Sequence, residues 1–245
     1  MNANELATAL ENVRTSTPLV HCITNYVTVN DCANALLACG GSPIMSDEPE
    51  DVVDITTICG GLVLNIGTLN KQTIAGMRAA GKRASELGHP IVLDPVGAGA
   101  SAATRGVDVN PDDVVTDENL AASAAFAKEL AKKTGAIIAI TGAIDIVAND
   151  ERAFAIRNGN AIMGKITGAG CMLSCLVGAY SVANKENMLE GVVAAIAGEG
   201  LCGQIAAERM TEADGNGSFR TYLLDAMYNL DAATLADGAL VQEVM

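Results

Sequence analysis

The stretch Lys165-Ile166-Thr167-Gly168-Ala169-Gly170-Cys171-Met172-Leu173, which continues in small and apolar residues to Tyr180, decides how the rest of the sequence is interpreted. It predicts the end of a strand, a Gly-Ala-Gly turn and then a buried helix. The first N–H groups of such a helix have no partner inside it, and they converge where the helix dipole favours negative charge. The turn therefore predicts an anion site beside Cys171, although a plain tight turn with close helix packing explains the same residues.

The composition of the 245-residue chain fits one large α/β domain with a full core. Hydrophobic residues make up 50% and aromatic residues only 3%, so small and aliphatic side chains must fill that core. The formal net charge of −14 excludes the basic surface needed to bind nucleic acid or an anionic membrane. A phosphate ligand would have to be held by backbone amides, a metal ion or a few cations.

Seven cysteines, an odd number, occur without a CxxC pair, and the sequence begins without a signal peptide. This pattern favours reduced, mostly buried thiols in a cytoplasmic protein. The charge-free run between Lys165 and Lys185 is nearly as long as a membrane span. Its early glycines and its Ser, Tyr and Asn residues favour a buried helix instead.

Short apolar runs alternate with helical patterns along the first 140 residues. Continuous apolar strands between helices are typical of a parallel sheet covered on both faces. We therefore expect an α/β fold with a mostly parallel central sheet and with helices on both of its faces. The expected strands are 19–24, 42–45, 61–65, 90–94 and 136–140, and the expected helices are 3–15, 29–40, one capped by Ser46, 70–88 and 117–133.

The stretch from Ala143 to Ile166 has a different character and predicts a small antiparallel section. Strands at 145–149 and 154–157 flank Asp150-Glu151, and Asn158-Gly159-Asn160 predicts a second hairpin turn. Helices are then expected at 171–183, 187–211 and 218–236. Because no linker, repeat or change of composition interrupts the chain, we expect a single domain over residues 1–245.

Ligands in open α/β sheets bind beyond the carboxyl ends of the strands, so the loops after the strands are the places to search. Asp94 follows one strand, where its carboxylate could hold Mg²⁺ directly or through water, or could bind its own turn. Cys171 could be a nucleophile, a base or a packed thiol, and a helix N-terminus should lower its pKa. The candidate strand exits are Met45-Ser46, Asn65-Ile66-Gly67-Thr68, Asp94-Pro95-Val96-Gly97-Ala98-Gly99 and Thr141-Gly142.

Several other kinds of site fit the sequence poorly. The Gly97–Ala102 stretch is a poor match to the dinucleotide-binding pattern, and a Gly-Lys-Ser/Thr phosphate loop is absent from the sequence. His21 and His89 are the only histidines, and their positions make a zinc site or a Ser-His-Asp triad improbable. We expect His21 to be a core histidine.

Five motifs, in this order, resemble the hydroxyethylthiazole kinase family of the ribokinase-like superfamily, and the resemblance covers nearly the whole chain. It implies phosphorylation of the hydroxyl of 4-methyl-5-(2-hydroxyethyl)thiazole by Mg-ATP in thiamine salvage. It also implies a homotrimer with active sites shared between neighbouring subunits. The motifs are His21-Cys22-Ile23-Thr24-Asn25, Gly41-Ser42-Pro43-Ile44-Met45, Val63-Leu64-Asn65-Ile66-Gly67-Thr68, Leu93-Asp94-Pro95-Val96-Gly97-Ala98-Gly99-Ala100 and Thr167-Gly168-Ala169-Gly170-Cys171.

The resemblance also implies roles for individual residues. Most superfamily members end the glycine turn with an Asp general base, whereas this chain has Cys171, so we expect Cys171→Asp to keep or raise the phosphorylation rate. A fall of several orders of magnitude in kcat would contradict that expectation. By matching position, Met45, Gly168, Asn25, Gly67 and Thr68 resemble thiazole-binding residues, Thr141 and Gly170 resemble ATP contacts, Asp94 resembles the carboxylate near the metal and phosphates, and Cys171 resembles the catalytic residue.

One departure from the family pattern falls between Arg105 and Gly106. The family has there a helix, a strand with an Arg-Gly-Asn…Glu motif and a second helix, roughly thirty residues or more, the size of a βαβ unit. We expect that a segment is missing at this junction. The alternatives to a thiazole kinase are a non-catalytic ligand-binding trimer, another ribokinase-like enzyme acting on a small alcohol, or a repair dehydratase that uses ATP; an oxidoreductase is the remotest.

Overall fold

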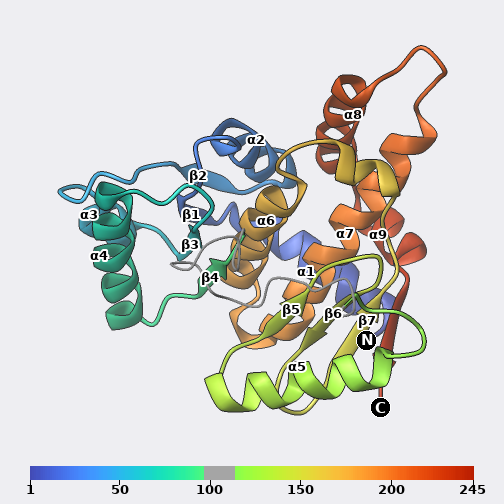
Figure 1. Cartoon of the computed structure of the whole chain (residues 1–245), viewed down its shortest axis with the longest axis horizontal. Helices are drawn as coiled ribbons and strands as arrows, with labels where there is room; N and C mark the ends of the chain where they lie inside the picture. Colours follow the sequence, from blue (N-terminus) through green and yellow to red (C-terminus); the bar gives the residue numbers. More distant parts are fainter. Residues whose placement is uncertain (97–113) are drawn as a thin grey trace. The chain divides into compact units, whose positions relative to one another are not determined.

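The computed structural model describes residues 1–96 and 114–245 (Figure 1). The chain divides into two compact units, which are described separately below. The antiparallel unit comprises Met1–Glu11, Val109–Lys165 and Asn187–Met245, and the parallel unit comprises Asn12–Asp108 and Ile166–Glu186. The loop Gly97–Gly99 and the Arg105–Gly106 junction lie outside the described residues. The expectation of a single domain stays a prediction.

The parallel unit is built on four parallel strands in the order β2-β1-β3-β4. The chain passes from β1 outward to β2 and then crosses back to β3 on the other side of β1. The connections that leave β1 and β3 therefore diverge at the boundary between these strands, which is where such sheets bind ligands. The strands are β1 (Leu19–Ile23), β2 (Ser42–Ile44), β3 (Gly61–Asn65) and β4 (Ile91–Asp94).

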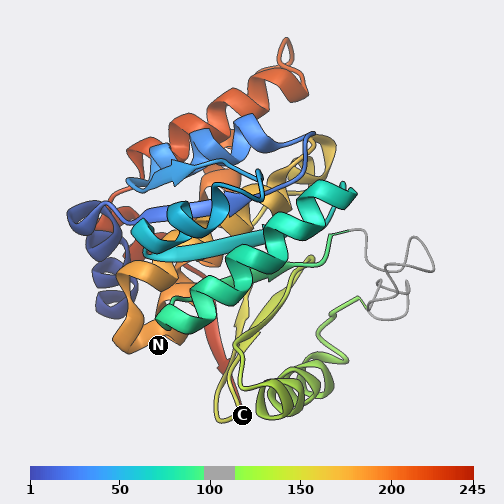
Figure 2. The same ribbon diagram turned by 90° about the vertical axis from the view of Figure 1, so that its left-hand side faces the viewer.

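Helices cover both faces of this sheet, as Figures 1 and 2 show. On one face, α3 and α4 pack over a buried cluster that includes Ile23, Val52 and Leu62. On the other face lies α6, where a Cβ added to Gly178 would lie 2.6 Å from Val63 Cγ2, so glycine allows the close approach of the helix. The helices of the unit are α2 (Val29–Cys39), α3 (Val52–Ile58), α4 (Lys71–Leu87) and α6 (Ala169–Ala183).

The antiparallel unit holds a second sheet in the order β5-β6-β7-β8. Helix α5 packs on this sheet over an aliphatic cluster that includes Ile144 and Ile146. The elements are α5 (Leu120–Thr134), β5 (Ile138–Ile140), β6 (Asp145–Ala148), β7 (Ala153–Ile156), η3 (Ala161–Lys165), α7 (Met188–Glu208), α8 (Asn216–Asn229), α9 (Ala232–Gly238) and β8 (Val241–Val244), while α1 (Ala3–Ser16) and η4 (Lys185–Asn187) contribute residues to both units.

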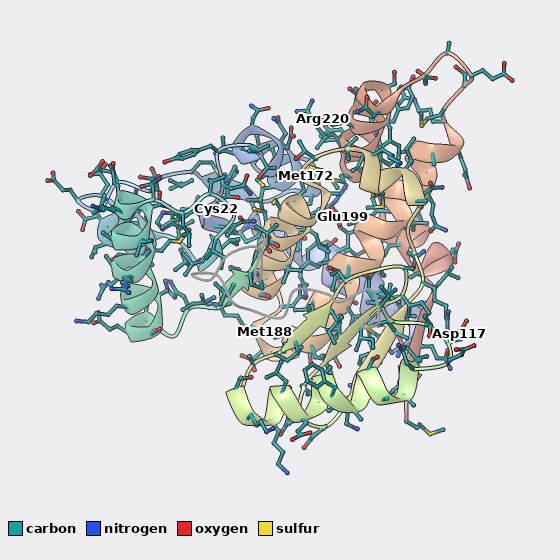
Figure 3. All side chains as sticks on the ribbon, in the orientation of Figure 1. Cys22, Asp117, Met172, Met188, Glu199 and Arg220 are labelled. Atoms are coloured by element: carbon teal, nitrogen blue, oxygen red, sulfur yellow. The ribbon has the colours of Figure 1, made fainter. Side chains whose placement is uncertain are left out.

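The described residues contain one helical segment, Lys185–Glu208, that is long and apolar enough to cross a membrane. Its mean hydropathy is 1.3, and 78% of the apolar window is buried inside the structure. Figure 3 labels Glu199 on this helix, and that residue is 4% exposed. The segment is therefore packed as a core helix. Helix α6, which lies in the charge-free run, is also mostly buried, as predicted.

Three local predictions are wrong. Ser46 does not cap a helix, because α3 begins only after Pro49, with Asp51 at its N-cap, and the residue before a proline avoids the helical conformation. The predicted hairpin at Asn158-Gly159-Asn160 leads into the 3₁₀ helix η3, and β7 pairs instead with β8. The single helix predicted at 218–236 is two helices, because Asp231 caps α9 by accepting a bond from Thr234 N at 2.7 Å.

Candidate active site

The carboxyl ends of the parallel strands and the start of α6 bring several predicted residues together. Asn25 lies just after β1, while Asn65 and Asp94 are the last residues of β3 and β4 and are paired in register. Helix α6 packs against β1, β3 and β4, and Cys171 lies in its first turn. Two side-chain amides, a carboxylate and a thiol therefore meet at one edge of the sheet.

The turn before α6 has the geometry that its glycines predict. Gly168 is the N-cap with a φ of 92°, and an added Cβ would lie 2.8 Å from Thr28 Cγ2, so both the backbone conformation and the space require glycine. Met172 N donates to Gly168 O at 2.8 Å, which is the first bond of the helix. In the described structure no side chain caps this helix, so its first amides can face a ligand.

Cys171 is 6% exposed, and its sulfur accepts two amide N–H bonds, from Asn25 Nδ2 and Asn65 Nδ2, both at 3.1 Å. Burial raises the pKa of the thiol, while hydrogen bonds from Thr28, Asn25 and Asn65 lower it and the Asp94 carboxylate raises it. The prediction of a lowered pKa is therefore wrong in direction, because desolvation of the thiolate outweighs the hydrogen bonds. The Thr28 side chain and the two amides are the groups that limit this rise.

Asp94 is half-buried, and its two carboxylate oxygens have different partners. Oδ2 accepts bonds from Asn65 Nδ2 at 2.6 Å and from Ser174 Oγ at 2.8 Å, whereas Oδ1 accepts a bond from Val96 N at 3.1 Å. Burial raises the pKa of this carboxyl, and these three bonds lower it. Asp94 therefore binds its own turn through one oxygen and connects β3 with α6 through the other.

The remaining predicted thiazole-binding residues also lie in the parallel unit. Gly67 N donates to Asn65 Oδ1 at 3.0 Å, and Thr68 Oγ1 accepts a bond from Tyr26 N at 3.1 Å. Met45 directly follows β2 and is half-buried. These positions are compatible with the predicted roles, which stay predictions.

His21 holds the loop that follows Met45. The histidine is fully buried in β1; its Nε2 lies 2.9 Å from Ser46 O and its Nδ1 lies 2.9 Å from Thr56 Oγ1. Burial lowers the pKa of the imidazole, and the bond to Ser46 O partly offsets this. His21 is therefore a core histidine with both ring nitrogens satisfied, as predicted.

Thr141 belongs to the antiparallel unit, in the turn between β5 and β6. The next amide, Gly142 N, donates to Asp145 Oδ1 at 2.8 Å. Burial raises the pKa of Asp145 to about 6, and the Gly142 bond counteracts part of that rise. The role of Thr141 as an ATP contact stays a prediction.

Sequence reasoning missed the importance of Asn65 and Ser174. Asn65 was only part of a strand exit, yet it bonds Asn25, Asp94 and Cys171. The sequence does contain a signal for Asn65: this asparagine ends the apolar strand β3, just as Asp94 ends the next apolar strand, β4, and the two residues are register partners. Ser174 lies three residues after Cys171, one helical turn further along α6, a spacing that places both side chains on one face.

The fold and the site together define a ribokinase-like small-molecule kinase. An Asp and two Asn side chains at the ends of the parallel strands meet the first turn of a helix that begins at a glycine turn. The chain belongs to the hydroxyethylthiazole kinase family, whose model matches residues 10–110 and 102–233.

Individual relatives agree with this family. A hydroxyethylthiazole kinase of Clostridium acetobutylicum is 49% identical over 94% of this chain and 96% of the relative. The solved structure of the hydroxyethylthiazole kinase of Pyrococcus horikoshii has a TM-score of 0.85 at 36% identity and covers 98% of this chain and 99% of its own. A Streptococcus mutans protein, SMU.573, has a TM-score of 0.61 at 10% identity, covers 94% of this chain and 100% of its own, and shows the fold alone.

Proposed function

We propose that this protein transfers the γ-phosphoryl group of ATP to the hydroxyl of 4-methyl-5-(2-hydroxyethyl)thiazole, a step of thiamine salvage. The observation that carries the proposal is the meeting of the uncapped start of α6 with Cys171 and Asp94 at the ends of β3 and β4. The substrate follows from the activity for which the family and its relatives are named.

The chemistry asks little of the protein beyond alignment and charge stabilisation. Backbone amides from Ala169 to Cys171 would stabilise the negative charge that the phosphoryl oxygens carry in the transition state. The Cys171 sulfur, as the thiolate, would accept the proton of the thiazole hydroxyl as its oxygen attacks phosphorus, with ADP as the leaving group. Because the pKa of this thiol is raised, only a small fraction of it is the thiolate near pH 7, and we expect the enzyme to be slow.

A magnesium ion would neutralise charge on the ATP phosphates. Within residues 1–96 and 114–245, no cluster of three or more His, Cys, Asp or Glu side chains could hold a metal ion. Asp94 offers a carboxylate at the end of β4, and both of its oxygens already accept hydrogen bonds. This set fits Mg²⁺ that is held mainly by phosphates and water, with Asp94 as a direct or water-mediated ligand.

The other roles belong to the same proposal. Asn25, Met45, Gly67, Thr68 and Gly168 would surround the thiazole. Gly170 and Thr141 would contact ATP. The active protein would be a cytoplasmic homotrimer of single-domain chains, with each site shared between neighbouring subunits.

A missing segment at the Arg105–Gly106 junction is also part of the proposal. The alignment with the Clostridium acetobutylicum relative extends over 263 positions but uses 94% of this 245-residue chain, which leaves about thirty positions without a partner here, the size of a βαβ unit. The two ranges that match the family model, 10–110 and 102–233, overlap at the same junction. In the family this segment would add an ATP contact and a metal-linked Glu.

The first experiment is a coupled assay of ATP consumption with and without the thiazole alcohol. The proposal expects ATP turnover that depends on the thiazole, with formation of its phosphate ester. A chain that binds the thiazole but leaves ATP intact would be a ligand-binding protein, and turnover only with other small alcohols would contradict the substrate.

A second experiment tests the anion site through Gly170, around which an added Cβ would meet no atom within 4 Å. Gly170→Ala should therefore fold normally, but its methyl group would enter the space proposed for the phosphate. We expect kcat/KM for ATP to fall about 10-fold or more, the order expected when one aligned contact of the transition state is lost.

The matched control is Gly217→Ala. Gly217 is also the second residue of a helix, α8, and an added Cβ there likewise meets no atom within 4 Å. Both changes should stabilise their helices to a similar degree, by about 0.4–1 kcal/mol. Equal kinase activity in the two variants would contradict a phosphate at the start of α6.

A further inference from the structure

Asn65 occupies the centre of the side-chain network at the edge of the parallel sheet. It is the last residue of β3, it is 1% exposed, and its register partner on β4 is Asp94. A buried amide of this kind must have its polar atoms satisfied by neighbours, since water cannot reach it.

Every hydrogen-bonding position of this amide is used. Its oxygen accepts bonds from Asn25 Nδ2 and from Gly67 N, both at 3.0 Å. Its nitrogen donates to Asp94 Oδ2 at 2.6 Å and to Cys171 Sγ at 3.1 Å. The opposite orientation would place the amide oxygen against a carboxylate and would leave the Gly67 N–H without its acceptor, so the neighbours fix which atom is nitrogen.

The placement of these two N–H groups has an electrostatic consequence. Asp94 and Cys171 carry, or develop, negative charge, and the carboxylate raises the pKa of the thiol. Asn65 directs one N–H to each of the two acceptors, so a single amide stabilises both charges. Because the sulfur also accepts a bond from Asn25, the proton of the thiol must point away from both amides.

We infer that Asn65 is a positioning residue of the kinase site: its amide fixes the Asp94 carboxylate and the Cys171 sulfur relative to each other and orients the sulfur so that, as the thiolate, it can take a proton from the substrate alcohol. This inference rests on the proposed function for its purpose but not for its test. Ser174 Oγ, which donates to Asp94 Oδ2 at 2.8 Å, fixes the same carboxylate from the side of α6.

The test is a pH titration of the Cys171 thiol in the folded protein without substrate. The titration is monitored by NMR of cysteine labelled with ¹³C at Cβ. The Cys171 signal is assigned by its loss in Cys171→Ser. In Asn65→Asp the side chain keeps its shape and its acceptor oxygen but loses the N–H that faces the sulfur and gains a negative charge. We expect the midpoint of the Cys171 titration to rise by one pH unit or more, or to leave the range below pH 10.5.

Two further variants complete the test. Asn184→Asp is the matched control, because Asn184 is a buried asparagine of the same unit that bonds Asn12 and Tyr180 O rather than the site. It should leave the Cys171 midpoint unchanged. Asn65→Ser keeps one hydroxyl donor and should give a smaller rise, which preserves the test if Asn65→Asp does not fold.

The inference is overturned if Asn65→Asp or Asn65→Ser titrates like the parent, or if Cys171 in the parent shows no titration below pH 10.5.

In the kinase assay, Asn65→Ser should lower kcat about 10-fold or more while KM for ATP changes less than 3-fold, because the residue acts on the proton acceptor. If the Asn65 variants shift the Cys171 midpoint as expected but the parent shows no thiazole-dependent turnover, the proposed function is contradicted and the role of Asn65 remains.

Discussion

Two neighbouring strands of the parallel unit, β3 and β4, have similar apolar sequences but very different surroundings. They pair in parallel over four register positions, from Leu62 with Ile91 to Asn65 with Asp94. Leu62 on β3 is fully buried, whereas Leu93 on β4 is 61% exposed. The difference arises because β3 pairs with β1 and β4, while β4 pairs, within the described part of the chain, only with β3.

The comparison teaches that an apolar run indicates that a strand is suited to the interior of a sheet. It does not indicate how many neighbouring strands cover it. A strand suited to the interior of a parallel sheet should not be left half covered. Strand β5 shows the same departure: Ala136–Ile140 was predicted to be a buried strand, yet β5 is at most half-buried and, among the residues that the structure describes, pairs only with β6. These two strands flank the Arg105–Gly106 junction in the sequence, where a strand is proposed to be missing.

The largest expected effect comes from restoring that segment. Inserting, between Arg105 and Gly106, the residues that the Clostridium acetobutylicum relative has there should raise thiazole-dependent ATP turnover by about 100-fold, since an ATP contact worth several kcal/mol would be regained. The measurement is kcat/KM of the two proteins side by side. The control is a Gly/Ser insertion of equal length, which forms no strand. Equal activity of both insertions, or a chain fully active without either, would contradict the missing segment.

A smaller effect is expected when the same substitution, Leu to Ala, is made in each of the two strands. Leu62→Ala should destabilise the fold by about 2–5 kcal/mol, because it opens a cavity in the core. Leu93→Ala should change stability by less than about 0.5 kcal/mol, because most of its side chain already faces solvent. Urea unfolding of both variants measures the difference. In the chain with the restored segment the cost of Leu93→Ala should rise, and an unchanged cost would show that β4 is an edge strand in the complete protein as well.

The smallest effect extends the comparison to the other sheet, where β6 is buried beside the edge strand β5. Asp145, the first residue of β6, is 9% exposed and has a pKa raised to about 6 by burial. The folded state therefore binds more protons than the unfolded state between about pH 4 and 6, so the contribution of this carboxyl to stability is present at low pH and is lost as the pH rises through 6.

Asp145→Asn removes this titration and keeps an oxygen acceptor for Gly142 N. Relative to the parent, the variant should become steadily more stable from pH 4 to 6, with a gain on the order of 3 kcal/mol above pH 6. Thermal unfolding at several pH values measures the gain, and Asp150→Asn, at an exposed position of the following turn, is the control. A stability difference that does not vary with pH would disprove the titration of Asp145.

The general architecture was predictable because it depends on periodicity and on turn residues. The four parallel strands, the α6 turn and the meeting of Asp94 with Cys171 follow from apolar runs that end in polar or glycine loops. Glycine at 168 was informative because only glycine suits a φ of 92° beside Thr28. Local patterns of this kind predict the structure correctly because tertiary packing does not override the conformation that they favour.

What could not be predicted depends on contacts between distant parts of the chain. Strand β8 pairs with β7 although some 85 residues separate them, and Asn158, which was predicted to lie in a hairpin turn, instead accepts a bond from Leu240 N and donates to Gly238 O. The direction of the Cys171 pKa shift depends on how completely the fold removes water from the thiol, which a helix N-terminus alone does not reveal. The central place of Asn65 likewise emerges only once β1, β3, β4 and α6 are assembled.

The buried ring of His21 connects the loop that follows Met45 with α3. A carbonyl oxygen can only accept, so Nε2 must carry the hydrogen that faces Ser46 O. With its pKa lowered, the ring is neutral near pH 7 and Nδ1 is bare. Thr56 Oγ1 lies 2.9 Å from this nitrogen and donates to Val52 O at 2.7 Å. The loop that follows Met45 is thereby tied to α3 through a neutral ring, so the connection places no net charge in the core.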